Sequence, residues 1–230
     1  MNCRPDVLIV QDRSGSMTND PGDRSCAGGC AGNSKWAIVS TAITNVVGTT
    51  DGIVNWGIKF FSDTKVCSAS GPPTVGIGAS TGAMVANAIA RTLPNGNTPT
   101  RDAITYATAY LQSLADSNPK FLLLATDGLP NCPAGCADLT NPSNSCTMTD
   151  NPTEDMAAEA AVTMAASQGI KTFVIGIGAL PTAENTLNQL AIAGDEAQTG
   201  AATSYYAAGD ESALETALTD IVHKITGCPH

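Results

Sequence analysis

The sequence predicts an α/β protein in which helices cover both faces of a mostly parallel central sheet, giving three layers with one short antiparallel strand at an edge. Two observations predict it. Short apolar runs alternate along the chain with segments of helical periodicity, the pattern of parallel strands joined by right-handed crossovers. The runs at 6–12 and 120–128 are continuously apolar, as expected for strands buried on both faces. No linker or internal repeat interrupts the pattern, so we expect a single domain, residues 1–230.

The first strand, DVLIVQD at 6–12, leads into a loop rich in Gly, Asp and Cys at 13–33. Apolar residues then recur at helical spacing from Trp36 to Val47, which indicates an amphipathic helix. Asn33 or Ser34 can cap its start, and Gly48 is expected to follow its end.

A second strand is predicted at 52–62, where GIVNWGIKFFS is rich in β-branched and aromatic residues. We expect the following SDTK turn to join it in a hairpin to a short edge strand at 66–70. Helices are predicted at 82–92 and 99–115, with Pro99 in a permitted first-turn position and Thr100 as an N-cap rather than a ligand.

The second half of the chain repeats the strand and helix alternation. A Pro-, Asn- and Cys-rich loop at 129–152 follows the buried strand at 120–128. The next helix should be capped by Thr153 and closed by Gly169, and the last helix should be capped by Asp210. The remaining elements are predicted as helices 154–168, 182–193 and 211–226 and strands 171–179 and 204–208.

Composition excludes several classes of function. Hydrophobic residues make up 43% of the chain and charged residues 14%, which is too apolar for a disordered protein. No apolar run is long enough to cross a bilayer, so membrane insertion is not expected. The net charge of -10 would repel phosphate backbones, so nucleic acid is not an expected partner.

Eight cysteines occur without a paired CxxC array, and the histidines are His223 and His230 alone, so zinc binding is the weaker interpretation. Disulfides in an oxidising compartment fit better, which predicts an extracellular or cell-surface location with any secretion signal trimmed from this sequence. The absence of a permitted glycosylation sequon leans towards a bacterial source.

Cys3 precedes the first strand and Cys228 follows the last helix. Because the termini of a domain often lie close together, we predict a Cys3–Cys228 disulfide. Pairing of the other six stays open, and these are Cys26, Cys30, Cys67, Cys132, Cys136 and Cys146.

Polar residues cluster where two central strands end. Asp12, Ser14 and Ser16 follow the first strand, and Asp127 follows the strand that begins at 120. In an open parallel sheet, ligands bind at the carboxyl ends of the strands near the point where strand order reverses. Carboxylates and hydroxyls are hard oxygen donors that suit Mg²⁺, Ca²⁺ or Mn²⁺.

The DRSGSM segment resembles the DxSxS motif of the von Willebrand factor type A (vWA) domain, which carries a metal-ion-dependent adhesion site. GNTPTRDA is similar to the threonine loop of that family, and LLLATDG to its strand-end aspartate. The resemblance implies a Rossmann-like fold in which Ser14, Ser16 and Thr98 bind the ion directly. Asp12 and Asp127 would hold it directly or through water. Arg13, between the motif residues, is interpreted as part of the turn.

The resemblance implies that the protein functions as an adhesion module and not as an enzyme. A divalent ion, Mg²⁺ first and Ca²⁺ or Mn²⁺ next, would face two protein carboxylates and keep one position for a carboxylate of an extracellular protein or glycan. Two alternatives stay open: a structural or assembly domain with a stabilising ion, and a metal-dependent hydrolase, which would need a general base. We expect the isolated domain to be a monomer whose last helix makes no large piston motion.

Overall fold

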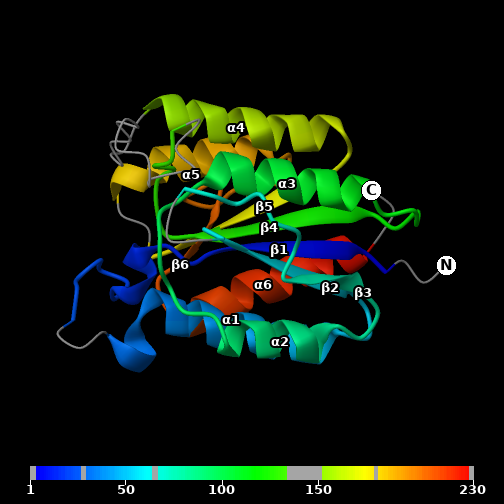
Figure 1. Ribbon diagram of the computed structural model, residues 1–230, viewed down its shortest axis with the longest axis horizontal. Helices are drawn as coiled ribbons and strands as arrows, with labels where there is room; N and C mark the ends of the chain where they lie inside the picture. Colours follow the sequence, from blue (N-terminus) through cyan, green and yellow to red (C-terminus); the bar gives the residue numbers. More distant parts are fainter. Residues whose placement is uncertain (1–3, 27–29, 64–66, 134–151, 179–180, 228–230) are drawn as a thin grey trace.

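A six-stranded sheet forms the middle layer of the structure, a computed structural model that describes residues 4–26, 30–63, 67–133, 152–178 and 181–227 (Figure 1). The strand order is β3-β2-β1-β4-β5-β6. All neighbouring strands pair in parallel except β2 and β3. The strands are β1 (Asp6–Asp12), β2 (Asn55–Phe61), β3 (Val75–Gly78), β4 (Lys120–Thr126), β5 (Lys171–Ile177) and β6 (Tyr206–Ala208).

Helices cover both faces of the sheet, as the sequence predicts. In Figure 1, α1, α2 and α6 lie below the sheet and α3, α4 and α5 lie above it. Their bounds are α1 (Lys35–Thr50), α2 (Gly82–Ala90), α3 (Thr100–Gln112), α4 (Pro152–Ser167), α5 (Pro181–Ala193) and α6 (Glu211–Thr226). The predicted three-layer α/β/α arrangement with one antiparallel edge strand is therefore confirmed.

Each central strand supplies both apolar cores. Successive side chains of a strand point to opposite faces of the sheet, so Val7 and Ile9 of β1 join the core with α1 and α6. Leu8 and Val10 join the core with α3, α4 and α5. This double burial explains why β1 and β4 read as unbroken apolar runs in the sequence.

The edge hairpin forms with a different partner from the one predicted. Val75–Gly78, not 66–70, pairs antiparallel with β2. Residues 67–70 are not a strand, although the Ser68 carbonyl accepts the Asp63 N–H. Gly57 lets β3 approach closely, since a Cβ at that position would lie 2.9 Å from the Val75 carbonyl oxygen. The two glycines of VGIG hid this strand from propensity arguments.

Three of the predicted helix-end signals are confirmed. The Ser34 hydroxyl accepts the Ala37 N–H at the start of α1, and the Asp210 carboxylate accepts the Ala213 N–H at the start of α6. Gly169 follows α4 with a φ of +78°, the left-handed conformation that glycine adopts easily. Two expectations were wrong. Helix α1 continues past Gly48 to Thr50, and Thr153 lies inside α4, which begins at Pro152.

Two disulfides lie in the described residues. Cys26 pairs with Cys30 within the loop after β1, and Cys67 pairs with Cys132, which joins the loop after β2 to the loop after β4. The predicted Cys3–Cys228 pair lies outside the described residues, as do Cys136 and Cys146. None of the helices in the described part of the chain is both long and apolar enough to span a membrane.

The central strands should dominate the stability of the fold. Leu124 is fully buried in β4, whereas Leu93 is 75% exposed. Truncating a buried leucine removes apolar contacts and leaves a cavity, so Leu124→Ala should lower the free energy of unfolding by about 3 kcal/mol. Leu93→Ala should change it by less than about 0.5 kcal/mol. Urea unfolding followed by circular dichroism measures both, and equal effects would contradict this account of the core.

Candidate metal centre

The predicted site residues lie at the carboxyl ends of β1 and β4, adjacent strands in the middle of the sheet. The next α-helix after β1 is α1 on one face, and the next described α-helix after β4 is α4 on the other face (Figure 1). The strand order reverses at this point, and chains that diverge to opposite faces leave a crevice between them. The topology therefore brings the first and third sequence motifs together.

Asp12 anchors the loop that carries the two serines. Its side chain is fully buried, and its Oδ1 accepts the Ser14 backbone N–H at 2.7 Å. Its Oδ2 accepts the hydroxyl of Thr126, the last residue of β4, at 2.6 Å. One carboxylate thus ties the DxSxS loop to the neighbouring strand.

The serine hydroxyls continue this connection to Asp127. Ser14 Oγ lies 3.0 Å from Ser16 Oγ, and Ser16 donates a hydrogen bond of 3.0 Å to Asp127 Oδ1. Four of the five predicted site residues, Asp12, Ser14, Ser16 and Asp127, therefore form one continuous set of hydrogen-bonded groups with Thr126.

Thr98 approaches the same place from a third loop. The Asn95 N–H donates to the Arg13 carbonyl at 2.6 Å, and the Gly15 N–H donates to the Gly96 carbonyl at 3.0 Å. Thr98, Ser16 and Asp127 line one cavity of about 210 Å³. The three sequence motifs thus meet at one cavity.

Asn131 holds the threonine loop and was not singled out from the sequence. Its Oδ1 accepts the Thr98 N–H at 2.9 Å, and its own N–H donates to the Thr98 carbonyl at 3.3 Å. The next residue, Cys132, is fixed by the disulfide to Cys67. The sequence signal that could have pointed to Asn131 was its position shortly after the TDG turn and next to a cysteine.

Lys35 is the second residue that the sequence did not reveal. Its side chain is 1% exposed, and its Nζ lies 2.7 Å from Asp127 Oδ2 and 2.8 Å from Asp23 Oδ1. Burial lowers the pKa of Lys35, but the charges and hydrogen bonds of Asp127 and Asp23 outweigh it, so the net shift is upward. The ammonium is therefore charged at neutral pH. A lysine in the first turn of a helix, where the macrodipole disfavours cations, was the signal for it.

Two further expectations concern neighbours of the motifs. Arg13 serves the turn: its guanidinium donates to the carbonyls of Ser62 and Leu93. Thr100 does not cap α3, because Pro99 occupies the N-cap position and Thr100 is the first helical residue. The Thr100 hydroxyl is buried without a hydrogen-bond partner in the described residues.

The donor set fits a hard divalent ion. Three hydroxyls and two carboxylates converge, and all of them offer oxygen, which Mg²⁺, Ca²⁺ and Mn²⁺ prefer. The described residues contain no group of three or more His, Cys, Asp or Glu side chains placed to hold a metal. Any ion held here would therefore depend on the hydroxyl groups as well as the carboxylates.

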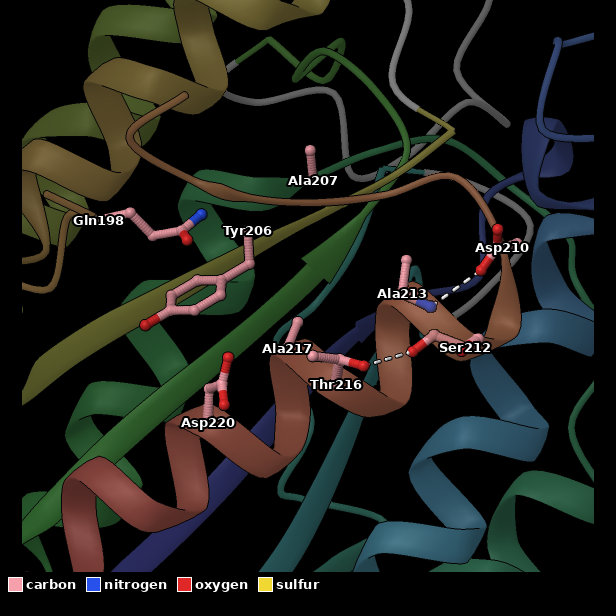
Figure 2. Close-up of a pocket in the computed structure, with 9 residues that line it drawn as sticks. All are labelled: Gln198, Tyr206, Ala207, Asp210, Ser212, Ala213, Thr216, Ala217 and Asp220. Atoms are coloured by element: carbon pink, nitrogen blue, oxygen red, sulfur yellow. Dashed lines mark hydrogen bonds between the residues drawn. The ribbon is translucent and has the colours of Figure 1, made fainter. Parts of the chain in front are cut away.

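A larger cavity, of about 470 Å³, lies between β6 and α6, with Tyr206 and Asp220 on its wall (Figure 2). The hydrogen bonds drawn there lie at the start of α6. Asp210 caps the helix, and the Thr216 hydroxyl donates to the Ser212 carbonyl. None of the three motifs contributes to this cavity, so its size does not identify the functional site.

The sequence profile of the von Willebrand factor type A domain matches residues 6–220. The chain belongs to this family. No curated protein matches it. The family profile and the fold therefore agree that this is a vWA domain, and the predicted site residues lie in one place.

Solved structures with the same fold share little sequence with this vWA domain. The pilus adhesin SpaC from Lactobacillus rhamnosus GG is 19% identical, with a TM-score of 0.68, over 98% of this chain and 31% of its own. The vWF domain of the type V pili tip protein Mfa5 from Porphyromonas gingivalis is 14% identical, with a TM-score of 0.69, over 100% and 98%. Proximal thread matrix protein 1 from the mussel byssus, with a zinc-occupied metal motif, is 17% identical, with a TM-score of 0.62, over 97% and 46%. The chain thus spans about a third of SpaC and about half of the byssus protein.

The burial of Asp12 predicts a pH dependence of the metal-free vWA domain. Burial, together with the neighbouring charge of Asp127, raises the pKa of Asp12 from 3.8 to about 7. Between those two values the folded state holds a proton that the unfolded chain has lost, so stability falls as pH rises. Thermal unfolding in EDTA should show wild type losing stability relative to Asp12→Asn from pH 4 to pH 7. The exposed Asp220→Asn variant should follow wild type, and parallel curves for Asp12→Asn and wild type would contradict the shift.

Proposed function

We propose that this vWA domain is an adhesion or binding module that captures a carboxylate of an extracellular protein or glycan through a divalent ion, Mg²⁺ first, with Ca²⁺ or Mn²⁺ as alternatives. The observation that carries the proposal is the hydrogen-bonded set from Asp12 through Ser14 and Ser16 to Asp127, with Thr98 on the same cavity.

Each residue has a distinct part in the proposed mechanism. Ser14, Ser16 and Thr98 would hold the ion with neutral oxygens, and Asp12 and Asp127 would hold it directly or through water. The ion, when bound, supplies the positive charge that attracts an acidic group. Because the protein contributes two carboxylates rather than three, the loaded site carries little excess negative charge to repel that group. Asn131 and Arg13 position the loops through their hydrogen bonds to Thr98 and Ser62.

Location and assembly are part of the proposal. The Cys26–Cys30 and Cys67–Cys132 disulfides favour an oxidising, extracellular setting. The similar folds in a pilus adhesin and a pilus tip protein support a role outside the cell. We propose that residues 1–230 form one domain, monomeric in isolation, that performs no catalysis. His223, the histidine in the described residues, lies on α6 and lines neither cavity described above.

A structural role for the ion is the second candidate, favoured by the fold shared with a byssus thread matrix protein whose metal motif holds zinc. In that case the ion would stabilise the loops, and no acidic ligand would be needed. The two candidates differ in what a change at Thr98 should do.

Metal binding tests the proposed site directly. Isothermal titration with MgCl₂ should give a saturable heat for the wild-type domain, and the melting temperature should rise with Mg²⁺ relative to EDTA. Asp12→Ala should remove both responses, because it removes a donor and the anchor of the serine loop. A wild-type domain that gives neither heat nor shift with Mg²⁺, Mn²⁺ or Ca²⁺ would end the proposal.

Thr98→Val separates adhesion from a structural ion. The valine keeps the shape of threonine and loses the hydroxyl donor, so Mg²⁺ affinity should fall at least tenfold. The melting temperature in EDTA should stay within about 2 °C of wild type, because the change is local and conserves shape. Thr105→Val, on the exposed face of α3, is the matched control and should change neither quantity. A loss of stability in Mg²⁺ that runs in step with the loss of metal binding would favour the structural role.

A further inference from the structure

A buried ammonium stands beside the proposed metal centre. Lys35 belongs to the first turn of α1, where the positive end of the helix dipole disfavours a cation. Its side chain is nevertheless 1% exposed. Burial of a lysine at a helix start is costly in both respects, so the two short ion pairs to Asp127 and Asp23 must compensate for it.

Both partners of Lys35 are themselves held in place. Asp127 divides its two oxygens: Oδ1 accepts the Ser16 hydroxyl, and Oδ2 faces the Lys35 ammonium. Asp23 accepts a second hydrogen bond from Asn19 Nδ2 at 3.0 Å. The Lys35 backbone N–H also donates to the Asn19 carbonyl at 2.9 Å. The Lys35 ammonium is therefore held in a fixed position between Asp127 and Asp23.

The charge balance of the centre depends on this lysine. In the described part of the chain, Asp127 and Asp23 line the cavity and both pair with Lys35, and the charge of Asp127 also acts on the buried Asp12. With all four charged, the set carries a net charge of -2, which one divalent ion neutralises. Without the ammonium the set would carry a net charge of -3. This charge attracts a divalent ion more strongly, and the centre stays negatively charged after the ion has bound.

We propose that Lys35 is a permanent second cation of the centre, which lowers its affinity for a divalent ion and keeps the loaded centre neutral towards an acidic ligand. The inference rests on the proposed function, because it assumes that the centre takes a divalent ion. It also implies that Asp127 serves the ion through Oδ1 alone, since Lys35 retains Oδ2.

A purely structural role for Lys35 predicts the opposite result. If the lysine only held Asp127 in position, its loss would disorder a ligand and weaken metal binding. If it acts as a competing charge, its loss should strengthen binding. The sign of the change in affinity therefore separates the two roles.

The experiment is isothermal titration of MgCl₂ into wild type and Lys35→Gln, with circular dichroism and melting in EDTA to confirm folding. Glutamine retains a hydrogen-bond donor for Asp127 and removes the charge. We expect Lys35→Gln to bind Mg²⁺ at least tenfold more tightly. The matched control is Lys120→Gln, which removes the same charge from a lysine paired with the buried Asp6 at the far end of the sheet. It should leave the affinity within twofold of wild type.

Asp23→Asn is the second variant and decides the matter should Lys35→Gln not fold. It retains Lys35 and removes a negative charge from its partner, so Mg²⁺ affinity should fall about threefold or more. Unchanged or tighter binding in Asp23→Asn would overturn the inference.

The outcomes of the titration separate the inference from the proposed function. Unchanged or weaker binding in Lys35→Gln, with wild type still binding, overturns the inference and leaves the function standing. Binding of Mg²⁺ by Lys35→Gln alone, with wild type still binding Mn²⁺ or Ca²⁺, supports the inference, because the ammonium then suppresses the affinity for Mg²⁺ below detection. If neither wild type nor Lys35→Gln binds an ion although both are folded, the inference and the proposed function are both overturned.

Discussion

The candidate centre depends on one buried carboxylate at the joint between two strands. Asp12 is fully buried and accepts hydrogen bonds from the Ser14 N–H and from the Thr126 hydroxyl. The first bond shapes the turn that presents Ser14 and Ser16, and the second ties that turn to the end of β4, where Asp127 follows. A carboxylate this deep is costly in its charged form, and that cost is what raises its pKa. The geometry is therefore prepared by the fold before any ion is considered.

Polar bonds of the same kind explain how the loops around the centre, which contain few apolar residues, hold their positions. The threonine loop is fastened to the serine loop by backbone bonds at Asn95 and Gly15, and to the loop after β4 by both bonds of Asn131. The Cys67–Cys132 disulfide then connects that last loop to the segment after β2. Hydrogen bonds and a covalent link thus replace hydrophobic packing at the rim of the sheet, where backbone groups would otherwise lack partners. Because the loops are bonded to the ends of the strands, the site residues on them are held in fixed positions.

The sequence reveals the central strands and the three motif segments because both are local signals. A run such as VLIV needs no knowledge of distant residues to be recognised as doubly buried, and DRSGSM is contiguous. The edge strand β3 was missed because its pairing depends on how closely Gly57 lets the chain approach, which propensity does not encode. Lys35 and Asn131 were missed for a related reason. Their roles exist only through partners 92 and 33 residues away, at Asp127 and Thr98.

Of the two residues that sequence reasoning missed, Lys35 sets the electrostatics of the centre. A list of oxygen donors describes what can bind an ion, but the affinity depends on the total charge that faces it, second neighbours included. Here the hydroxyl donors contribute none, and Lys35 offsets one of three nearby carboxylates. On this proposal, a centre with a buried lysine beside its carboxylates binds a metal ion less tightly than one without the lysine. Its bound ion then attracts an incoming acidic group more strongly. Weak metal binding and strong anion capture would then be two effects of the same arrangement of charges.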